Sequence, residues 1–191
     1  MSQAKLRRLA ELVTKWSGRI NLVSKHDLPL LWERHIQDSL ALAPYIPAGT
    51  DAAIDLGSGA GFPGLVLAIE TGIAFTLIES DSRKAAFLME AGRELNAPVK
   101  VLNARIEAAR IMPAPLITAR ALAPLDKLLG LAVPLLAAGG VCLFPKGRRV
   151  EDELKAAELL WRYQLERCTN PFNAEACILK LGQIHHAGQP R

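Results

Sequence analysis

The sequence has few of the features that mark secreted, membrane-spanning or metal-binding proteins. Its three cysteines are odd in number and lack the spacing of metal ligands, and two lie in apolar, strand-like segments, so we expect reduced thiols. No apolar stretch of the signal-peptide type follows the basic N-terminus. The longest apolar region, residues 131–144, is interrupted by Pro134 and by Gly139 and Gly140. We therefore expect a cytoplasmic protein without membrane segments.

Chain length and net charge restrict the possible folds and partners less strongly than these missing features do. The 191 residues, half of them hydrophobic, suit one globular domain with a sizeable core and leave room for an N-terminal extension. The net charge of +4 is compatible with a polyanionic partner but does not require one. No internal repeat, low-complexity tract or change of composition marks a linker.

The most informative segment is residues 52–64, AAIDLGSGAGFPG, in which an apolar run ends near Asp55 and opens into a glycine-rich loop. It predicts a strand, a loop and a helix start, with Pro63 in the first helical turn, where its missing N–H is not needed. Glycines allow backbone N–H groups to approach a ligand closely. Three glycines alternating over five residues exceed what a plain turn needs, so we expect a nucleotide-like cofactor.

Asp55 discriminates between two cofactor classes. The pattern Gly59-x-Gly61-x-x-Gly64 also fits the dinucleotide fingerprint, and Glu79 follows at about the 20-residue spacing of that fingerprint. A pyrophosphate at the loop mouth would meet Asp55, and like charges about 4 Å apart repel by roughly 4 kcal/mol at a dielectric of 20. S-adenosylmethionine is cationic and has no phosphate, so its methionine portion suits Asp55. Glu79, at the end of the next strand, can accept hydrogen bonds from the ribose hydroxyls.

Two amphipathic helices are predicted before this segment, at residues 3–20 and 29–43. Their apolar stripes are typical of core packing, and a loop at residues 21–28 joins them. His35 lies near the apolar face of the second helix, where its residue type favours a hydrogen-bonded histidine at a helix contact.

Beyond residue 50, strand and helix patterns alternate, as in a parallel sheet with helices on both faces. We expect parallel strands at 52–56, 74–78, 99–102, 115–119 and 141–144. We expect helices at 64–71, 81–96, 105–111, 124–137 and 151–162. Two short strands, 164–168 and 176–181, should form an antiparallel hairpin around a turn at 169–173.

Such a seven-stranded, mostly parallel sheet with a C-terminal antiparallel hairpin is the Rossmann-like α/β fold of class I S-adenosylmethionine-dependent methyltransferases. Ligands of this fold lie beyond the carboxyl ends of the first strands. We expect an N-terminal helical extension at 1–46, a methyltransferase core at 47–184 and a frayed tail at 185–191, whose adjacent histidines cannot complete a metal site.

The end of the fourth predicted strand, residues 118–124, limits the acceptor chemistry. It has no cysteine to act as the nucleophile in C5 methylation of a pyrimidine. The Asn/Asp-Pro-Pro-aromatic tetrad used on exocyclic amines is absent, and Asn170-Pro171-Phe172 is an incomplete match that we interpret as a turn. What remains is an acceptor that loses no proton, such as guanine N7, for which positioning is sufficient.

Two basic features lie near the same edge of the predicted sheet. Arg120 could present paired donors to guanine N7 and O6, orient the cofactor or pair with an acid, and its residue type leaves these roles open. Residues 146–149, Lys-Gly-Arg-Arg, suit contacts with RNA phosphates. The alternative is a solvated turn balanced by the acidic residues 151–153.

Several segments occur together in one order along the chain: Asn21–Ser24, Arg34–Leu40 (Arg-His-Ile-Gln-Asp-Ser-Leu), Asp55–Gly64, Arg105–Glu107, Ala119–Ala121 and Lys146–Gly147. Together they resemble the bacterial 16S ribosomal RNA guanine-N7 methyltransferase G family (RsmG, or glucose-inhibited division protein B). The glycine loop alone would indicate only a methyltransferase. The Arg-His-Ile-x-Asp-Ser-Leu segment makes the resemblance specific.

The resemblance implies methyl transfer from S-adenosylmethionine, which leaves S-adenosylhomocysteine, to N7 of guanine 527 in the 530 loop of 16S rRNA. It implies cofactor contacts at Gly57, Phe62, Ile106, Glu107 and Arg120. With the residues expected from the loop chemistry, the full cofactor set adds Asp55, Gly59 and Glu79. No catalytic acid or base and no metal ligand is assigned. One departure is that Glu79 stands in Glu-Ser-Asp-Ser-Arg-Lys, where many relatives have Asp-Ser followed by Leu.

For the RNA, we predict contacts from Arg34, His35, Lys146, Arg148 and Arg149, with the N-terminal helices helping to dock the small ribosomal subunit. We expect the protein to act as a monomer. Two alternatives stay open at this stage. One is a class I methyltransferase that acts on another nucleic acid or on a protein, and the other is a non-catalytic module that binds NAD or another nucleotide.

Overall fold

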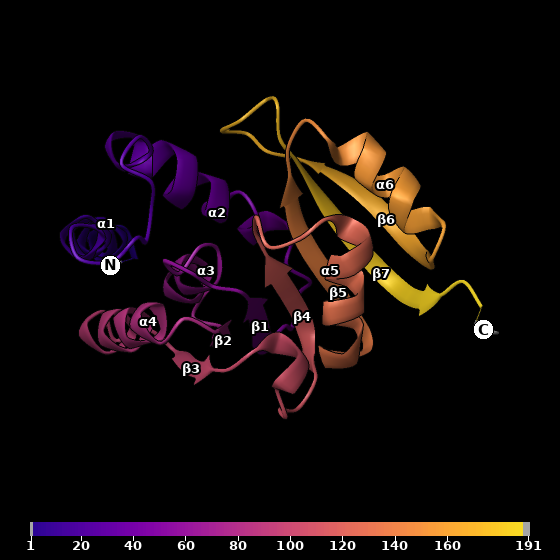
Figure 1. The fold of residues 1–191 in the computed structure, drawn as a ribbon, viewed down its shortest axis with the longest axis horizontal. Coiled ribbons are helices and arrows are strands. Elements are labelled where there is room, and N and C mark those ends of the chain that lie inside the picture. The colour runs from indigo at the N-terminus through magenta and orange to yellow at the C-terminus, as the bar shows by residue number, and fades with distance from the viewer. Residues whose placement is uncertain (1, 189–191) are drawn as a thin grey trace.

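A seven-stranded sheet runs through the computed structural model, which describes residues 2–188 (Figure 1). The strands are β1 (Ala52–Leu56), β2 (Ala74–Glu79), β3 (Val99–Asn103), β4 (Ala114–Ala119), β5 (Leu136–Lys146), β6 (Trp161–Thr169) and β7 (Cys177–His186). Their order is β3-β2-β1-β4-β5-β7-β6, and only the pairings of β7 with β5 and β6 are antiparallel. The predicted sheet with its C-terminal hairpin is therefore confirmed.

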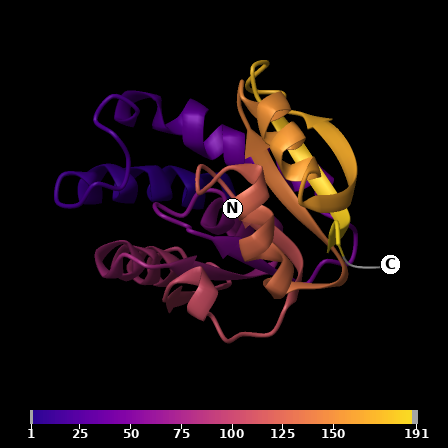
Figure 2. The ribbon, with the colours of Figure 1, turned by 45° about the vertical axis from the view of Figure 1, so that its right-hand side comes forward.

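Helices cover both faces of the sheet, as Figure 2 shows. One face carries α1 (Ser2–Ser17), α3 (Gly64–Thr71) and α4 (Ser82–Glu94), and the other carries α5 (Leu125–Ala132) and α6 (Val150–Glu158). Side chains alternate along each strand, so Leu116 packs under the first group of helices and its neighbour Ile117 under the second. Each face therefore has its own apolar cluster.

The N-terminal helix belongs to the first of these clusters. Leu6, Leu9, Leu12 and Val13 are buried on α1, as the helical spacing predicts, and they pack with residues of α3 and α4. The Trp16 ring meets Phe87 of α4 edge-on, with 5.7 Å between the ring centroids. Apolar burial thus fastens the segment before residue 47 to the sheet domain.

The parallel register places the ends of the central strands side by side. Leu56 at the end of β1 pairs with Ile78 of β2 on one side and with Ala119 at the end of β4 on the other. The loops that follow these strands therefore emerge at one edge of the sheet. The β1 and β4 loops leave on opposite faces, which is where open α/β sheets bind ligands.

The predicted second helix, 29–43, is wrong as a continuous α-helix. It consists of a 3₁₀ turn at Leu28–Leu30, a π-helical segment at Trp32–Gln37, the short α2 (Asp38–Leu40) and a 3₁₀ turn at Ala43–Tyr45. The second 3₁₀ turn contains Pro44, which has no N–H to donate to the Leu40 carbonyl, so the helical hydrogen bonding ends with α2. The predicted helix at 105–111 is also wrong, because only a 3₁₀ turn forms at Ile106–Ala108 and the backbone is extended at Ala109.

The C-terminal strands are longer than predicted. The β5 strand starts at Leu136 rather than 141, and β7 continues to His186 rather than ending at 181. Pairing with β6 causes the second difference, because Trp161 and Arg162 lie opposite His186 and His185. The two histidines therefore belong to a strand and not to a frayed tail. Residues 189–191 lie outside the described residues.

The glycine-rich loop covers a buried acid. Asp55 is fully buried, its Oδ1 accepts a 2.6 Å hydrogen bond from the Thr118 hydroxyl, and its Oδ2 has no partner in the described part of the chain. Placing Asp55 at the loop mouth was therefore wrong. Its side chain points, like that of Ala53, toward the α3 face, where Gly64 lies against it. Burial raises the pKa of this carboxyl to about 6.

The buried acid predicts a specific pH dependence of stability. The folded-state pKa of Asp55 lies above its ordinary value, so between about pH 4 and pH 6 the folded protein holds a proton that the unfolded chain has released. The Asp55 contribution to the free energy of unfolding should therefore fall by up to about 3 kcal/mol as the pH rises through this window, and level off above it.

Urea unfolding of the wild type and of Asp55→Asn between pH 4 and pH 8 tests this, because asparagine keeps an acceptor for Thr118 and does not titrate. We expect the difference between the two free energies to change across the window. A difference that is independent of pH would contradict the assignment.

Gly64 predicts a second effect on stability. A Cβ at this position would lie 2.5 Å from the Asp55 Cβ and 2.6 Å from a Leu77 methyl carbon, so Gly64→Ala should lower the free energy of unfolding by about 1–3 kcal/mol. Gly130→Ala in α5 is the matched control, since its Cβ would meet nothing nearer than Trp161 at 3.8 Å. The control should gain about 0.5–1 kcal/mol in urea unfolding at pH 7. Equal effects of the two variants would refute this account.

Candidate functional site

The loop after β1 has the backbone of a ligand cradle. Gly57 and Gly59 adopt φ values of +65° and +56°, in the left-handed region that favours glycine. A Cβ at Gly57 would lie 2.7 Å from a Leu122 methyl group, whereas one at Gly59 would meet nothing nearer than 3.9 Å. The loop therefore keeps its backbone bare where it faces the carboxyl edge of the sheet.

Glu79 at the end of β2 ties this loop to the neighbouring strand. One carboxylate oxygen accepts the Gly59 N–H at 2.9 Å, and the other accepts the Asp81 N–H at 2.7 Å. Each oxygen of an ionised carboxylate can accept more than one hydrogen bond. Glu79 lines the adjacent cavity, so its remaining acceptor capacity suits the hydroxyl groups of a ribose.

Two cavities lie along the glycine loop. The first, about 330 Å³, is lined on the β2 and β3 side by Gly57, Gly59, Glu79, Ile106, Glu107 and Arg120. The second, about 320 Å³, is lined on the N-terminal side by Ser24, His35, Gly57, Gly59, Phe62 and Arg120. Every predicted cofactor residue except the buried Asp55 lines one of these cavities. The bare glycine backbone and the Glu79 acceptors fit S-adenosylmethionine.

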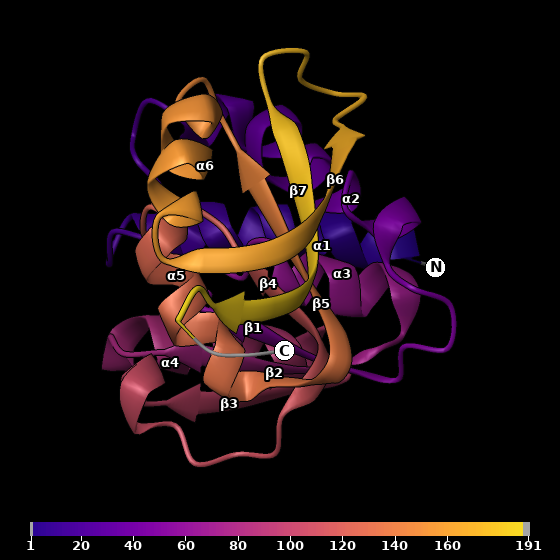
Figure 3. The same ribbon diagram turned by 90° about the vertical axis from the view of Figure 1, so that its right-hand side faces the viewer.

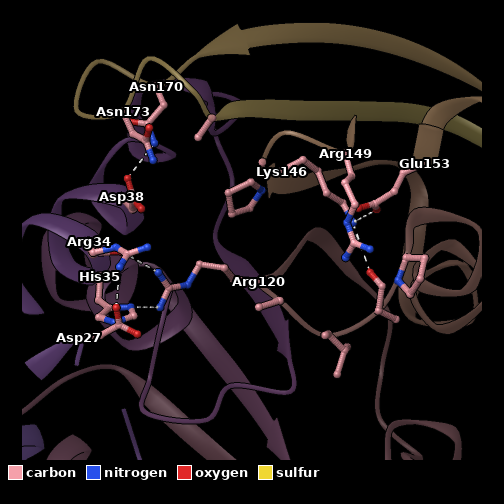
Figure 4. Close-up of a pocket in the computed structure, with 17 residues that line it drawn as sticks. Asp27, Arg34, His35, Asp38, Arg120, Lys146, Arg149, Glu153, Asn170 and Asn173 are labelled. Atoms are coloured by element: carbon pink, nitrogen blue, oxygen red, sulfur yellow. Dashed lines mark hydrogen bonds and ion pairs between the residues drawn. The ribbon is translucent and has the colours of Figure 1, made fainter. Parts of the chain in front are cut away.

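Arg120, directly after β4, lies at the centre of a cluster with the N-terminal segment (Figure 4). Its guanidinium donates to His35 Nδ1 at 2.7 Å and to the Arg34 carbonyl at 3.0 Å, and its central carbon lies 5.3 Å from the centroid of the Phe62 ring. The His35 ring stacks on Phe62, with 5.2 Å between centroids and 16° between planes. The predicted hydrogen-bonded histidine is thus present, and its partner is Arg120.

His35 is neutral in this arrangement. A guanidinium can only donate, so Nδ1 must accept and the ring proton sits on Nε2. Burial, followed by the nearby charge of Arg120, lowers the pKa of His35 to about 4. The imidazole therefore carries no charge at neutral pH.

A third and larger cavity, about 650 Å³, opens beside the two along the glycine loop (Figure 4). It shares Arg120 with both of them and His35 with the second. Its polar lining residues are Asp27, Arg34, His35, Asp38, Arg120, Lys146, Arg149, Glu153, Asn170 and Asn173. Arg120 is therefore the junction between the cofactor-side cavities and this outer cavity.

The basic residues after β5 differ in their partners. Lys146 is mostly buried, and its ammonium bonds Glu153 at 2.6 Å and the Ala123 carbonyl at 3.3 Å. Arg148 does not line the cavity and pairs on the surface with Glu175 at 2.6 Å. Arg149 lines the cavity and has no ion pair within residues 2–188. The turn is therefore partly charge-balanced, as the alternative interpretation expected, and the RNA role of these residues stays a prediction.

The loop between β6 and β7 contributes a wall that sequence reasoning missed. Figure 1 and Figure 3 show this loop projecting beyond the sheet, and it reaches α2, where Asn170 donates to Asp38 at 2.9 Å. Asn170 also accepts the Phe172 N–H, as in the predicted turn. The same segment lines the outer cavity. No local pattern announces this contact, because 132 residues separate its partners.

The described residues lack membrane-spanning helices and clustered metal ligands. No helix within residues 2–188 combines the length and apolar character needed to cross a bilayer. No group of three or more His, Cys, Asp or Glu side chains in the same range is placed to hold a metal ion.

Comparisons with known structures identify the fold. The chain superimposes on the ribosomal protein L11 methylase of Lactobacillus delbrueckii with a TM-score of 0.62 and 14% identity, over 77% of each chain. An O-methyltransferase of Bacillus cereus, solved with S-adenosylhomocysteine, gives a TM-score of 0.59 and 16% identity, over 92% of this chain and 91% of that one. At these identities the likeness shows a class I methyltransferase fold.

Sequence comparisons are more specific. The family model described as "rRNA small subunit methyltransferase G" (GidB) matches residues 2–175. The ribosomal RNA small subunit methyltransferase G of Acidiphilium cryptum is 52% identical over 95% of this chain and 85% of its own length. The corresponding protein of Gluconobacter oxydans is 56% identical over 82% of this chain and 81% of its own. These matches confirm the predicted S-adenosylmethionine-dependent rRNA methyltransferase, and the chain belongs to the rRNA small subunit methyltransferase G family.

Proposed function

We propose that this protein transfers a methyl group from S-adenosylmethionine to N7 of guanine 527 in the 530 loop of 16S rRNA. Family membership supplies the enzyme class and the rRNA. The observation that carries the finer proposal is the position of Arg120, at the junction of cavities lined by the cofactor residues and a larger cavity flanked by basic residues.

On the cofactor side, we assign the ribose hydroxyls to Glu79 and the adenine to the Ile106-Glu107 turn. Gly57 and Gly59 let the ligand approach the loop backbone closely. Asp55 would support the site without facing the ligand, because its bond to Thr118 ties β1 to β4 underneath the loop. Phe62 and Arg120 close the side that faces the N-terminal segment.

In the proposed reaction, the protein's task is to position the methyl donor and the guanine. S-adenosylmethionine supplies an electrophilic methyl group when bound, and guanine N7 offers a lone pair without losing a proton, so no general base is needed. The titratable groups of the outer cavity support this view, because many are already engaged. His35 is bonded to Arg120, Lys146 to Glu153 and Asp38 to Asn170. We therefore assign no catalytic acid or base.

On the acceptor side, we propose that the outer cavity and its rim receive the RNA. Arg34 and Arg149 line the cavity, where Arg34 pairs with Asp27 at 2.6 Å, and the exposed Arg148, next to Arg149, pairs with Glu175. His35 and Lys146 are held by protein partners, so their proposed contribution to RNA binding is to shape the wall. Residues 1–46 would act as a docking extension of the core at 47–184. We further propose that the protein works as a monomer on small ribosomal subunits in the cytoplasm.

The direct test is methyl transfer from labelled S-adenosylmethionine to naked 16S rRNA and to small ribosomal subunits, followed by mapping of the labelled nucleotide. We expect one labelled guanine at position 527, and no label on subunits in which that guanine is replaced by adenine. Label at another nucleotide, or on protein, would overturn the proposed acceptor and would favour the alternative of a different substrate.

Arg149 gives a second test, since it is a cavity-lining cation with no ion pair in the described chain. Arg149→Ala should raise KM for the RNA by roughly five- to tenfold and reduce the slope of log(kcat/KM) against log salt by about one. The control is Arg162→Ala, which removes a guanidinium bonded to the Glu158 and Trp161 carbonyls near the start of β6. Equal salt slopes for wild type and Arg149→Ala would exclude a phosphate contact at this position.

A further inference from the structure

We propose that His35 is a positioning residue for methyl-donor binding, because its neutral imidazole and the adjacent Arg34 carbonyl hold the Arg120 guanidinium at the cofactor cavities. The inference rests on the proposed function for the identity of the cofactor. It assigns to the Arg34–Leu40 segment a role that does not depend on contact with RNA.

The hydrogen bonds of Arg120 support this role of His35. Both of its hydrogen-bond acceptors are neutral, the His35 Nδ1 atom at 2.7 Å and the Arg34 carbonyl oxygen at 3.0 Å. No carboxylate forms an ion pair with Arg120 within residues 2–188; burial lowers the pKa of its guanidinium, and the nearby charges of Asp38, Asp55 and Asp27 oppose that shift. The two neutral acceptors engage two of the guanidinium N–H donors without cancelling the charge, which stays available to a ligand in the adjoining cavities.

The contacts of His35 itself also support this role. Its ring stacks on Phe62, a residue of the glycine loop, and its carbonyl oxygen accepts the Ser39 hydroxyl at 2.6 Å. Nε2 is buried and has no partner in the described chain. Arg120 is therefore the only hydrogen-bond partner of the His35 ring among the described residues. The low pKa of His35, about 4, keeps Nδ1 an acceptor throughout the physiological range.

The backbone that carries the two acceptors, His35 Nδ1 and the Arg34 carbonyl oxygen, is itself unusual. Arg34 and His35 are consecutive residues of the π-helical segment Trp32–Gln37, and π-helical turns are frequent at functional sites. The same two residues line the outer cavity, where the RNA is proposed to bind. The segment therefore lines the acceptor side with both residues, and it reaches the cofactor side through Arg120 and through His35, which also lines the second glycine-loop cavity.

The test compares two substitutions that separate the properties of the ring. His35→Phe keeps a flat ring for stacking on Phe62 but removes the acceptor. His35→Asn removes the ring but places an amide oxygen where Nδ1 was, two bonds from Cβ. In calorimetric titration with S-adenosylhomocysteine, we expect His35→Phe to weaken binding roughly ten- to hundredfold, as for loss of a hydrogen bond to a buried charged group. His35→Asn should stay within about threefold of the wild type.

A double-mutant cycle identifies the partner. If His35 acts through Arg120, His35→Phe should cause no further loss of S-adenosylhomocysteine affinity in an Arg120→Ala background. Additive losses, or wild-type affinity for His35→Phe with Arg120 intact, would overturn the proposal. None of these titrations contains RNA, so a failure to methylate guanine 527 would leave their outcome intact.

A spectroscopic measurement covers the case in which His35→Phe does not fold. The ¹⁵N chemical shifts of His35 in the wild type should report a neutral ring protonated at Nε2, with Nδ1 as a hydrogen-bonded acceptor. In Arg120→Ala the Nδ1 shift should move toward that of an unbonded nitrogen. Identical His35 shifts in the two proteins would show that the ring does not hold Arg120, and would refute the proposal.

Discussion

The site depends on the parallel register of β2, β1 and β4. This register sets the ends of the three strands against one another and releases the glycine loop, Glu79 and Arg120 at one edge of the sheet. Residues that are dispersed along the sequence reach the same cavities only because these strands end level. The hydrogen bond from Thr118 to Asp55 reinforces the alignment, since it joins β1 to β4 directly beneath the loop.

The burial of Asp55 changes the physical reason for the cofactor assignment. From the sequence, we expected this carboxylate to face the ligand and to repel a pyrophosphate. In the structure it is covered by the loop, its pKa is raised to about 6, and its side chain bonds Thr118 of β4 beneath the loop. The cofactor class was right, but the bare glycine backbone, the Glu79 acceptors and the family relationship now support it, and the electrostatic argument from Asp55 does not.

The charges around the outer cavity are arranged unevenly. Lys146 and Arg148 are compensated by Glu153 and Glu175, whereas Arg120 is held by neutral acceptors and Arg149 lines the cavity without an ion pair in the described chain. The charge of a compensated cation contributes little to attracting a polyanion. Among the described cations that line the outer cavity, those without a carboxylate partner therefore lie at the cavity junction and at one position of the wall.

The sequence by itself determined what depends on neighbouring residues. The strand–loop–helix unit around the glycine loop, the alternation of strands and helices and the family motifs are all local patterns, and the structure and comparisons confirm them. Local patterns were weaker where a short segment had no strong periodicity, as at Ile106–Ala108, or where a proline ended a helical stretch, as at Ala43–Tyr45.

Tertiary structure alone decided which way the functional side chains point and what they meet. The Arg120 bond to His35 joins residues 85 positions apart, and the Asn170 bond to Asp38 joins residues 132 positions apart. Neither contact follows from propensity or periodicity, because each depends on the order of the strands and on how the loops fold over their ends. The chemical groups of the site are therefore readable in the sequence, whereas their partners, burial and charge state exist only in the folded chain.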